Sequence, residues 1–165
     1  MLGDSTVGKT SILKQFIMNT MDPEESSTIG AMFVRKLIDL DDGSRVNIHF
    51  WDTAGQERYW GLIPMYVRGA NFALIVYDVT NKDSFESIDR WIRFLINTPD
   101  TKFIIISNKN DLSHQKAISN MIGKQKAEQL ETVFFDVSAR KGTNIKELFN
   151  YIIEEGKKIS SEVKK

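Results

Sequence analysis

The sequence contains no cysteine, only three prolines and no apolar run long enough to cross a membrane. The absence of cysteine excludes a disulfide-stabilised scaffold and a metal site built from thiolates, and it is typical of proteins from a reducing compartment. A membrane-spanning helix needs about 20 consecutive apolar residues, and no signal peptide opens the chain. These absences lead us to expect a cytoplasmic globular protein.

The sequence also lacks an excess of charge of either sign. The 165 residues contain 22 Lys and Arg against 22 Asp and Glu. A neutral balance gives no bulk attraction to nucleic acid or to an anionic membrane, so we expect no nucleic-acid partner. Apolar residues make up 41% of the chain, which at this length is enough for one buried core. We therefore predict a single domain over residues 1–165.

Strands and helices alternate along the predicted chain. Continuous or alternating apolar residues predict strands, and apolar residues at helical spacing predict helices. The expected helices are 9–19, 84–97, 119–131 and 144–158, and the expected strands are 33–40, 46–51, 72–77, 103–107 and 132–137. The first two strands are joined by a hairpin turn at 41–44. The later alternation predicts an α/β fold with a largely parallel sheet.

A glycine-rich segment at residues 3–10, GDSTVGKT, fits the phosphate-binding pattern G-x-x-x-x-G-K-[ST]. Its glycines let the backbone bend closely around an anion, and consecutive N–H groups then point into one concave site. We predict that Lys9 brings a positive charge to the outer phosphates and that the Thr10 hydroxyl ligates Mg²⁺. Taken alone, the segment could also be a glycine-rich turn before a helix.

A second motif, DTAGQE at residues 52–57, follows a predicted strand. Asp52 at the strand end can hold Mg²⁺ through water, the Gly55 N–H can meet a γ-phosphate, and Gln56 can orient an attacking water. Thr28, in the loop after the first helix, could complete the Mg²⁺ coordination when a γ-phosphate is present. These residues together predict a triphosphate site whose loops respond to the terminal phosphate.

A third motif, NKND at residues 108–111, follows another predicted strand. Asp111 can accept hydrogen bonds from the N1–H and the 2-amino group of guanine, and adenine does not offer that pair. Asn108 suits the O6/N7 side of the base, and the stem of Lys109 can pack on the ring. The Ala139 N–H, which follows the last strand, can bond guanine O6. Each motif alone could be a polar turn, but in this order they predict a guanine nucleotide as ligand.

The motifs GDSTVGKT, STIG, WDTAGQERY, YVRGA, YDVTN, NKND and SAR are spread from residue 3 to residue 142 and resemble those of the Ras-like small GTPases, most closely the Rab family. The segment at residues 64–66, PMY, resembles the early-endosomal branch of that family. The resemblance implies a three-layer P-loop NTPase fold with a mostly parallel twisted sheet and one antiparallel edge strand. It also implies a molecular switch in vesicle trafficking that binds GTP or GDP with Mg²⁺ and hydrolyses GTP slowly.

The resemblance also assigns roles to individual residues of this sequence. Those that bind phosphate are Gly3, Asp4, Ser5, Thr6, Val7, Gly8, Lys9, Thr10, Ser11 and Gly55. Those that bind guanine are Asn108, Lys109, Asp111, Ser138, Ala139 and Arg140. Those that bind Mg²⁺ are Thr10, Thr28 and, through water, Asp52, while Gln56 is the catalytic residue. Those that match the aromatic triad of the Rab effector surface are Phe33, Trp51 and Tyr66, although these rings can also serve core packing.

The expected partners follow from the chemistry of phosphoryl transfer, which depends on positioning and charge stabilisation. The sequence shows no arginine placed to act from within the site. We therefore expect dependence on a GTPase-activating protein and an exchange factor, and the resemblance also implies effectors and a monomeric protein. No C-a-a-X or paired-cysteine end is present, so we expect no membrane anchor in this chain and peripheral endomembrane association only with a prenylated tail.

Among the departures from the family pattern, two bear on the fold and on nucleotide binding. The family has a central strand directly before the phosphate loop, whereas here Met1 and Leu2 alone precede it, so we predict that this strand is missing or truncated. Met21 stands where the family places an aromatic ring against guanine, and because methionine is flexible we expect faster nucleotide release. The alternative function is therefore a catalytically impaired interaction module that binds nucleotide weakly. An adenine-specific P-loop enzyme is disfavoured by Asp111.

Overall fold

The computed structural model describes residues 1–18, 28–40 and 42–162. Met21, and with it the expectation of fast nucleotide release, lies outside these residues. The elements in chain order are α1 Lys9–Met18, β1 Ala31–Asp39, β2 Arg45–Thr53, the 3₁₀ helix η1 Glu57–Leu62, α2 Ile63–Val67, β3 Phe72–Asp78, α3 Lys82–Glu86, α4 Ile88–Arg93, β4 Lys102–Asn108, the 3₁₀ helix η2 Ser113–Gln115, α5 Asn120–Gln129, β5 Val133–Asp136 and α6 Ile145–Glu162. None of these described helices is both long and apolar enough to span a membrane.

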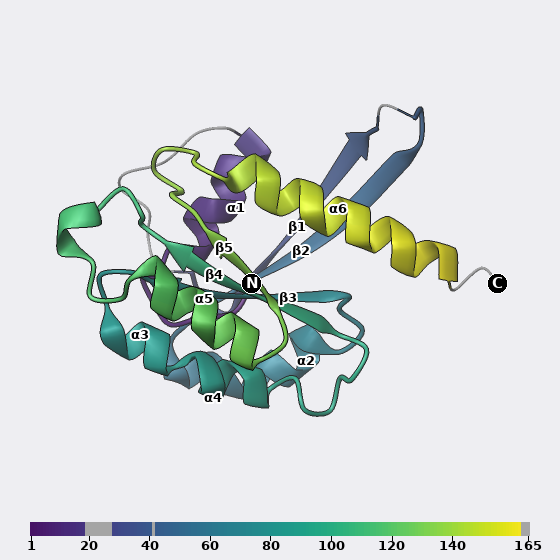
Figure 1. Cartoon of the computed structure of the whole chain (residues 1–165). Helices are drawn as coiled ribbons and strands as arrows, with labels where there is room; N and C mark the ends of the chain where they lie inside the picture. The colour runs from purple at the N-terminus through teal and green to yellow at the C-terminus, as the bar shows by residue number, and fades with distance from the viewer. Residues whose placement is uncertain (19–27, 41, 163–165) are drawn as a thin grey trace.

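The centre of the molecule is a parallel sheet in the order β3-β4-β5 (Figure 1). Because side chains alternate along a strand, β3 and β4 contribute to a core on each face. Leu74 and Val76 pack with α1 and α6 on one face, whereas Ile75 and Tyr77 pack with α2, α4 and α5 on the other. Burial on both faces explains why these strands are continuous apolar runs. The predicted three-layer α/β fold is confirmed.

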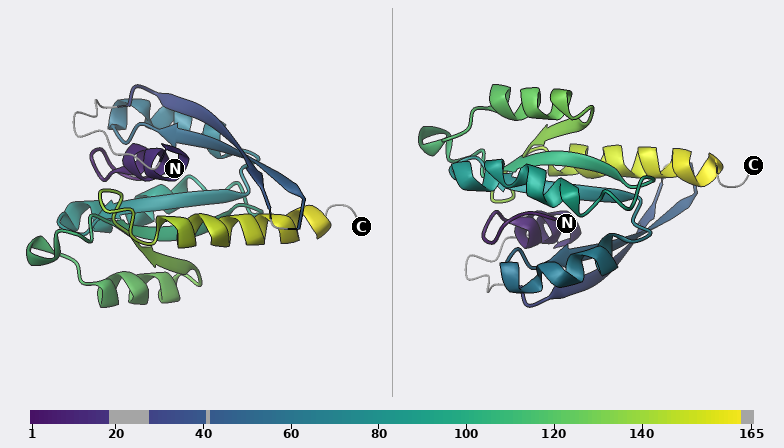
Figure 2. Two further views of the ribbon diagram at one scale, coloured as in Figure 1. Left: turned by 90° about the horizontal axis from the view of Figure 1, so that it is seen from above. Right: turned by 90° about the horizontal axis from the view of Figure 1, so that it is seen from below.

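The first two strands form a separate antiparallel hairpin, paired from Ala31 with Thr53 to Asp39 with Arg45. The side chains of β2 alternate as the sequence predicts. Val46, Ile48 and Phe50 are half-buried or buried, and Asn47, His49 and Trp51 are exposed. Figure 2 shows the hairpin at one side of the molecule, with the N-terminus and α1 between it and the parallel sheet.

The prediction of one continuous helix over residues 84–97 is wrong, because the segment is divided at Ser87 into α3 and α4. The Ser87 hydroxyl donates to the Asp83 carbonyl at 2.9 Å, and the Arg90 amide donates to the Ser87 carbonyl three residues back at 3.0 Å. A serine that bonds the backbone in this way competes with the regular helical ladder. Residues 94–97 continue in turns with the same three-residue spacing, so α4 ends at Arg93.

Met1 and Leu2 connect the hairpin with the parallel sheet. Leu2 forms a single parallel bridge with Ile75: its amide donates to the Leu74 carbonyl at 2.7 Å, and its carbonyl accepts from the Val76 amide at 2.8 Å. On the other side, the Met1 amino group donates to the Trp51 carbonyl at 2.8 Å. Among the described residues, a two-residue segment thus takes the place of a central strand.

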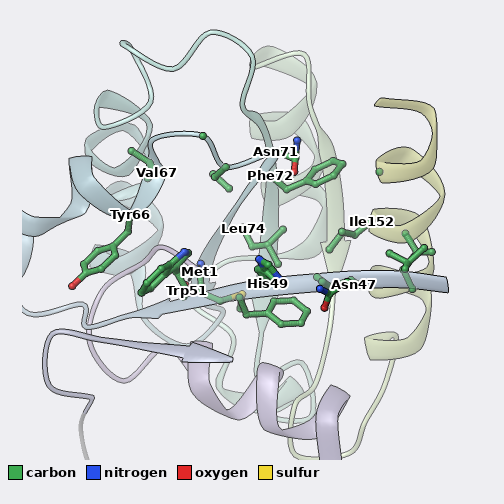
Figure 3. Close-up of a pocket in the computed structure, with 18 of the residues that line it drawn as sticks. Met1, Asn47, His49, Trp51, Tyr66, Val67, Asn71, Phe72, Leu74 and Ile152 are labelled. Atoms are coloured by element: carbon green, nitrogen blue, oxygen red, sulfur yellow. Dashed lines mark hydrogen bonds between the residues drawn. The ribbon is translucent and has the colours of Figure 1, made fainter. Parts of the chain in front are cut away.

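Next to these two residues, the space between β2 and β3 is a pocket of about 840 Å³ (Figure 3). Asn47, His49 and Trp51 line it from β2, and Phe72 and Leu74 line it from β3. Backbone groups of alternate residues face the same edge of a strand. The backbone groups of Leu74 and Val76 face Leu2, at the edge of β3 next to the pocket. The backbone groups of Phe72, two residues before Leu74, therefore face the same edge. The pocket is therefore bordered by strand edges as well as by side chains.

Candidate nucleotide-binding site

The phosphate loop lies between the Leu2 bridge and α1, beside the carboxyl ends of β3 and β4. Thr6 (φ 64°) and Gly8 (φ 94°) are left-handed, and left-handed residues within a tight loop turn successive N–H groups toward one concave face. A Cβ at Gly8 would lie 2.2 Å from Nδ2 of Asn108, so both the conformation and the packing require glycine there. The loop thus directs N–H groups to the N-terminus of the ten-residue helix α1, which favours an anion.

Lys9 is buried inside this loop, with 6% of its surface exposed. Its Nζ donates to the carbonyls of Gly3 and Asp4, each at 2.8 Å. Burial lowers the pKa of Lys9 to about 8, although the nearby Asp52 and Asp4 carboxylates oppose this effect. Desolvation of the ammonium group therefore outweighs the attraction of these carboxylates, and a phosphate held in the loop would stabilise its charge further.

Three oxygen-bearing side chains meet at the start of α1. The Thr10 hydroxyl donates to Oδ2 of Asp52 at 2.5 Å and lies 3.0 Å from the hydroxyl of Thr28. Asp52 is fully buried at the end of β2. Hard oxygen ligands suit Mg²⁺, which takes one or two protein oxygens and completes its shell with water and phosphate. The structure brings together all three residues predicted to hold the ion.

The segment after β2 packs directly on the phosphate loop. A Cβ at Gly55 would lie 2.3 Å from the Asp4 carbonyl carbon and 2.4 Å from the Ser5 nitrogen, so only glycine permits this close approach. Gln56 follows at the N-cap of η1 in an extended conformation, with φ −76° and ψ 140°. Gly55 therefore lies against the glycine-rich loop of residues 3–10, and Gln56 follows it directly.

Asn108 connects the phosphate loop with the loop after β5. It is almost fully buried; its Nδ2 donates to the Val7 carbonyl at 2.9 Å, and its Oδ1 accepts from the Ala139 amide at 3.0 Å. The side chain thus holds two binding loops together. In this structure the Ala139 N–H, predicted to bond guanine O6, is directed at Asn108, so a bond to the base would be shared.

The remaining predicted guanine residues lie along the same edge. Oδ1 of Asp111 accepts from the Ser138 hydroxyl at 2.6 Å, and Arg140 is exposed beside them. Lys109 is left-handed at φ 67°, and its Nζ pairs with Asp78 at 2.7 Å. Asp78 was missed in the sequence analysis, although an acidic residue at the end of a buried strand could have indicated it. All these groups follow carboxyl ends of parallel strands, where ligands bind in open α/β sheets.

The three aromatic residues predicted to form an effector surface lie together. The rings of Phe33 and Trp51 are 4.9 Å apart between centroids, and those of Trp51 and Tyr66 are 5.2 Å apart. Phe33 is 48% exposed and Trp51 41% exposed. Contiguous exposed aromatic surface is more typical of an interaction site than of core packing. The alternative role of these rings as core residues is therefore less favoured.

Similar sequences are known. The family model described as "Ras family" matches residues 1–158. The chain is 40% identical to Ras-related protein RABA1b of Arabidopsis thaliana over 163 residues, which are 98% of this chain and 75% of that protein. It is 41% identical to Ras-related protein RGP2 of Oryza sativa subsp. japonica over 157 residues, 94% of this chain and 72% of that protein.

Proposed function

Since this chain belongs to the Ras family, among the Rab-related small GTPases of membrane trafficking, we propose that residues 1–165 form one G domain that binds GTP and GDP with Mg²⁺ and hydrolyses GTP slowly. One observation supports this best: the phosphate loop, the Thr10–Thr28–Asp52 oxygens and Asp111 lie along one edge of the parallel sheet. A nucleotide along this edge would place its phosphates in the loop, its Mg²⁺ at the threonine and aspartate oxygens, and its base at Asp111.

At the phosphate end, the loop N–H groups and the Lys9 ammonium would hold the β- and γ-phosphates. The hydroxyls of Thr10 and Thr28 would ligate Mg²⁺ directly, and Asp52 would hold it through water. When bound, Mg²⁺ neutralises charge on the phosphate oxygens. Because the Thr28 hydroxyl reaches Thr10 at 3.0 Å, the loop that carries Thr28 can respond to the presence of the ion.

At the base end, selectivity rests on Asp111. Its carboxylate would accept two hydrogen bonds from guanine, while the Ser138 hydroxyl that donates to Oδ1 at 2.6 Å fixes its orientation. The aliphatic part of the Lys109 side chain would pack on the guanine ring. Asn108 would hold the phosphate loop and the loop after β5 in their relative positions. The Ala139 amide and the exposed Arg140 would line the rim.

Hydrolysis would depend on Gln56 to orient water and on the Gly55 N–H to stabilise charge on the γ-phosphate. We infer that turnover is slow without an activating protein and that an exchange factor controls release of GDP. Effectors would bind the aromatic surface of Phe33, Trp51 and Tyr66. The protein would act as a monomer at the periphery of endomembranes.

The test is to quantify nucleotide that co-purifies with the protein and then to measure phosphate release from GTP with Mg²⁺, with ATP as competitor. Protein that is empty and ignores GTP in excess Mg²⁺ would contradict nucleotide binding, and equal competition by ATP would contradict guanine selection. Binding without hydrolysis would favour the alternative of an interaction module that lacks catalysis.

A substitution at Asp111 tests base recognition directly. Asp111→Asn replaces one acceptor by a donor, so we expect binding of guanosine nucleotides to fall and binding of xanthosine nucleotides, which carry a carbonyl at C2, to rise. Asp100→Asn is the matched control, because Asp100 is exposed and remote from the predicted site. An unchanged preference in the Asp111 variant would remove this residue from the guanine site.

A further inference from the structure

A network of side chains from α4 and η1 surrounds Asp4, a residue of the phosphate loop. Oδ1 of Asp4 accepts from Nη2 of Arg90 and from Nε1 of Trp91, each at 2.8 Å. Nη2 of Arg90 also donates to the Ser87 hydroxyl at 2.7 Å. A carboxylate that pairs with a guanidinium and accepts a second hydrogen bond is held in a fixed orientation. The phosphate loop is thereby attached to α4.

The same arginine contacts the segment that carries Gln56. The Arg90 guanidinium lies over the Trp60 ring, 4.4 Å from its centroid, and Nε of Arg90 is buried without a hydrogen-bond partner among the described residues. The Trp60 ring in turn meets Trp91 edge to face, 5.9 Å between centroids. Among the aromatic rings, tryptophan gives the most favourable cation–π contact with a guanidinium.

Trp60 is also bonded to the loop next to the phosphate site. Its Nε1 donates to the Gly55 carbonyl at 3.3 Å, and Gly55 itself packs on the Asp4–Ser5 peptide without room for a Cβ. The two loops therefore touch through their backbones and are connected a second time through Arg90. We call Asp4, Arg90 and Trp60 the Asp4–Arg90–Trp60 bridge.

We propose that Arg90 is a positioning residue that couples the phosphate loop to the segment carrying Gly55 and Gln56, with Trp60 as the contact through which it acts. This rests on the proposed nucleotide site. A terminal phosphate that moves Gly55 also moves the indole bonded to it and changes its stacking on Arg90. Arg90 thus keeps Gln56 in a fixed position relative to the phosphate loop during hydrolysis. Through the same contact, the surroundings of Trp60 change with the nucleotide state.

The experiment compares Arg90→Gln with Arg93→Gln, a matched control on the exposed side of the same helix. Arg90→Gln is expected to slow single-turnover GTP hydrolysis by about 2-fold to 30-fold, the usual range for coupling through a side-chain network. GDP affinity should change less than about threefold, since the groups that hold the phosphates and the base remain. Arg93→Gln should match the parent in both measurements.

A spectroscopic readout separates coupling from a loss of stability. In a Trp51→Phe background, the indole fluorescence change between the GDP form and the form with a non-hydrolysable GTP analogue should be present. Arg90→Gln should abolish that change, and Arg93→Gln should retain it. A retained change with parental hydrolysis in Arg90→Gln would overturn the proposal, whereas a parent protein that binds no GTP would refute the proposed function instead.

Two further variants keep the test decisive. If Arg90→Gln does not fold, Trp60→Leu removes the stacked ring and its N–H donor and should slow hydrolysis to a similar extent; an unchanged rate would overturn the proposal. If Arg90 acts through Asp4, adding Arg90→Gln to Asp4→Asn should slow hydrolysis no further. Fully multiplicative effects would show that the two residues act independently and would also overturn it.

Discussion

The two sheets of this molecule lie in very different surroundings. Ile75 and Ile105, in the middle of β3 and β4, are fully buried, whereas the hairpin leaves Leu37 55% exposed and Trp51 41% exposed. The predicted base-binding groups follow the strands of the buried sheet. The predicted effector surface lies on and beside the hairpin, which Met1 and Leu2 join to that sheet. The molecule thus combines a buried ligand-binding part, which carries the predicted nucleotide-binding groups, with a more exposed hairpin that carries the predicted effector surface.

Substitutions in the two sheets should show this difference most strongly. Ile105→Ala removes three carbons from a fully buried site, and such changes cost about 2–5 kcal/mol. Leu37→Ala removes an exposed side chain of the hairpin and should stay within about 0.5 kcal/mol. Urea unfolding followed by circular dichroism measures both. Equal losses would show that the hairpin is packed as firmly as the parallel sheet.

Filling the pocket between β2 and β3 should reduce the difference in packing between the hairpin and the parallel sheet. An N-terminal extension of five valine- or isoleucine-rich residues ahead of Met1 can continue the Leu2 bridge along β3 and bury apolar surface in the pocket. We expect a gain of about 2 kcal/mol, seen as a rise in Tm of several degrees. A five-residue glycine–serine extension is the control. If both extended proteins melt like the parent, the pocket does not accept a strand.

In a protein produced to begin at Met1, the buried amino group of that residue makes the same region sensitive to pH. Burial lowers its pKa from 8.0 to about 6, so between these values the folded protein binds fewer protons than the unfolded chain. Stability should therefore rise by about 2 kcal/mol from pH 6 to pH 8. The apolar extension replaces the amine by a peptide N–H, and in that protein the rise should disappear. If stability still rises from pH 6 to pH 8 in the extended protein, a group other than the Met1 amine causes the rise.

Much of this architecture could be predicted from local sequence. The continuous apolar runs of β3 and β4, the alternation along β2 and the glycine spacing of residues 3–10 each reflect a local physical requirement. The division of the helix at Ser87 could not be predicted, because a serine within a helical pattern does not reveal whether its hydroxyl will bond the backbone.

Contacts between distant residues explain the other differences. Nothing local indicates that Asp4 will meet Arg90, 86 positions further along the chain, or that Lys109 will pair with Asp78. Asn108 could be assigned to the site from its motif. Its two bonds to other loops depend on the packing of three segments, so the sequence indicates the residue but not how it acts.

Lys36 is a further connection between the hairpin and the rest of the molecule. Its substitution is the test with the smallest expected effect on stability. From β1, its Nζ donates to the Phe16 carbonyl at 2.7 Å and lies 4.2 Å from the centroid of the Phe16 ring. Phe16 is in the last turn of α1, where a positive charge satisfies unpaired carbonyls and opposes the helix dipole.

Lys36→Met keeps most of the apolar stem but removes the charge and its donors. We expect a loss of about 1 kcal/mol, measured by urea unfolding. Arg35→Met makes the same change of charge at the neighbouring, exposed position and should have little effect. Hydrogen exchange at the end of α1 should become faster in the Lys36 variant. If both variants unfold alike, α1 is held by its packing against α6, and the hairpin contributes less to the ligand-binding part than this contact indicates.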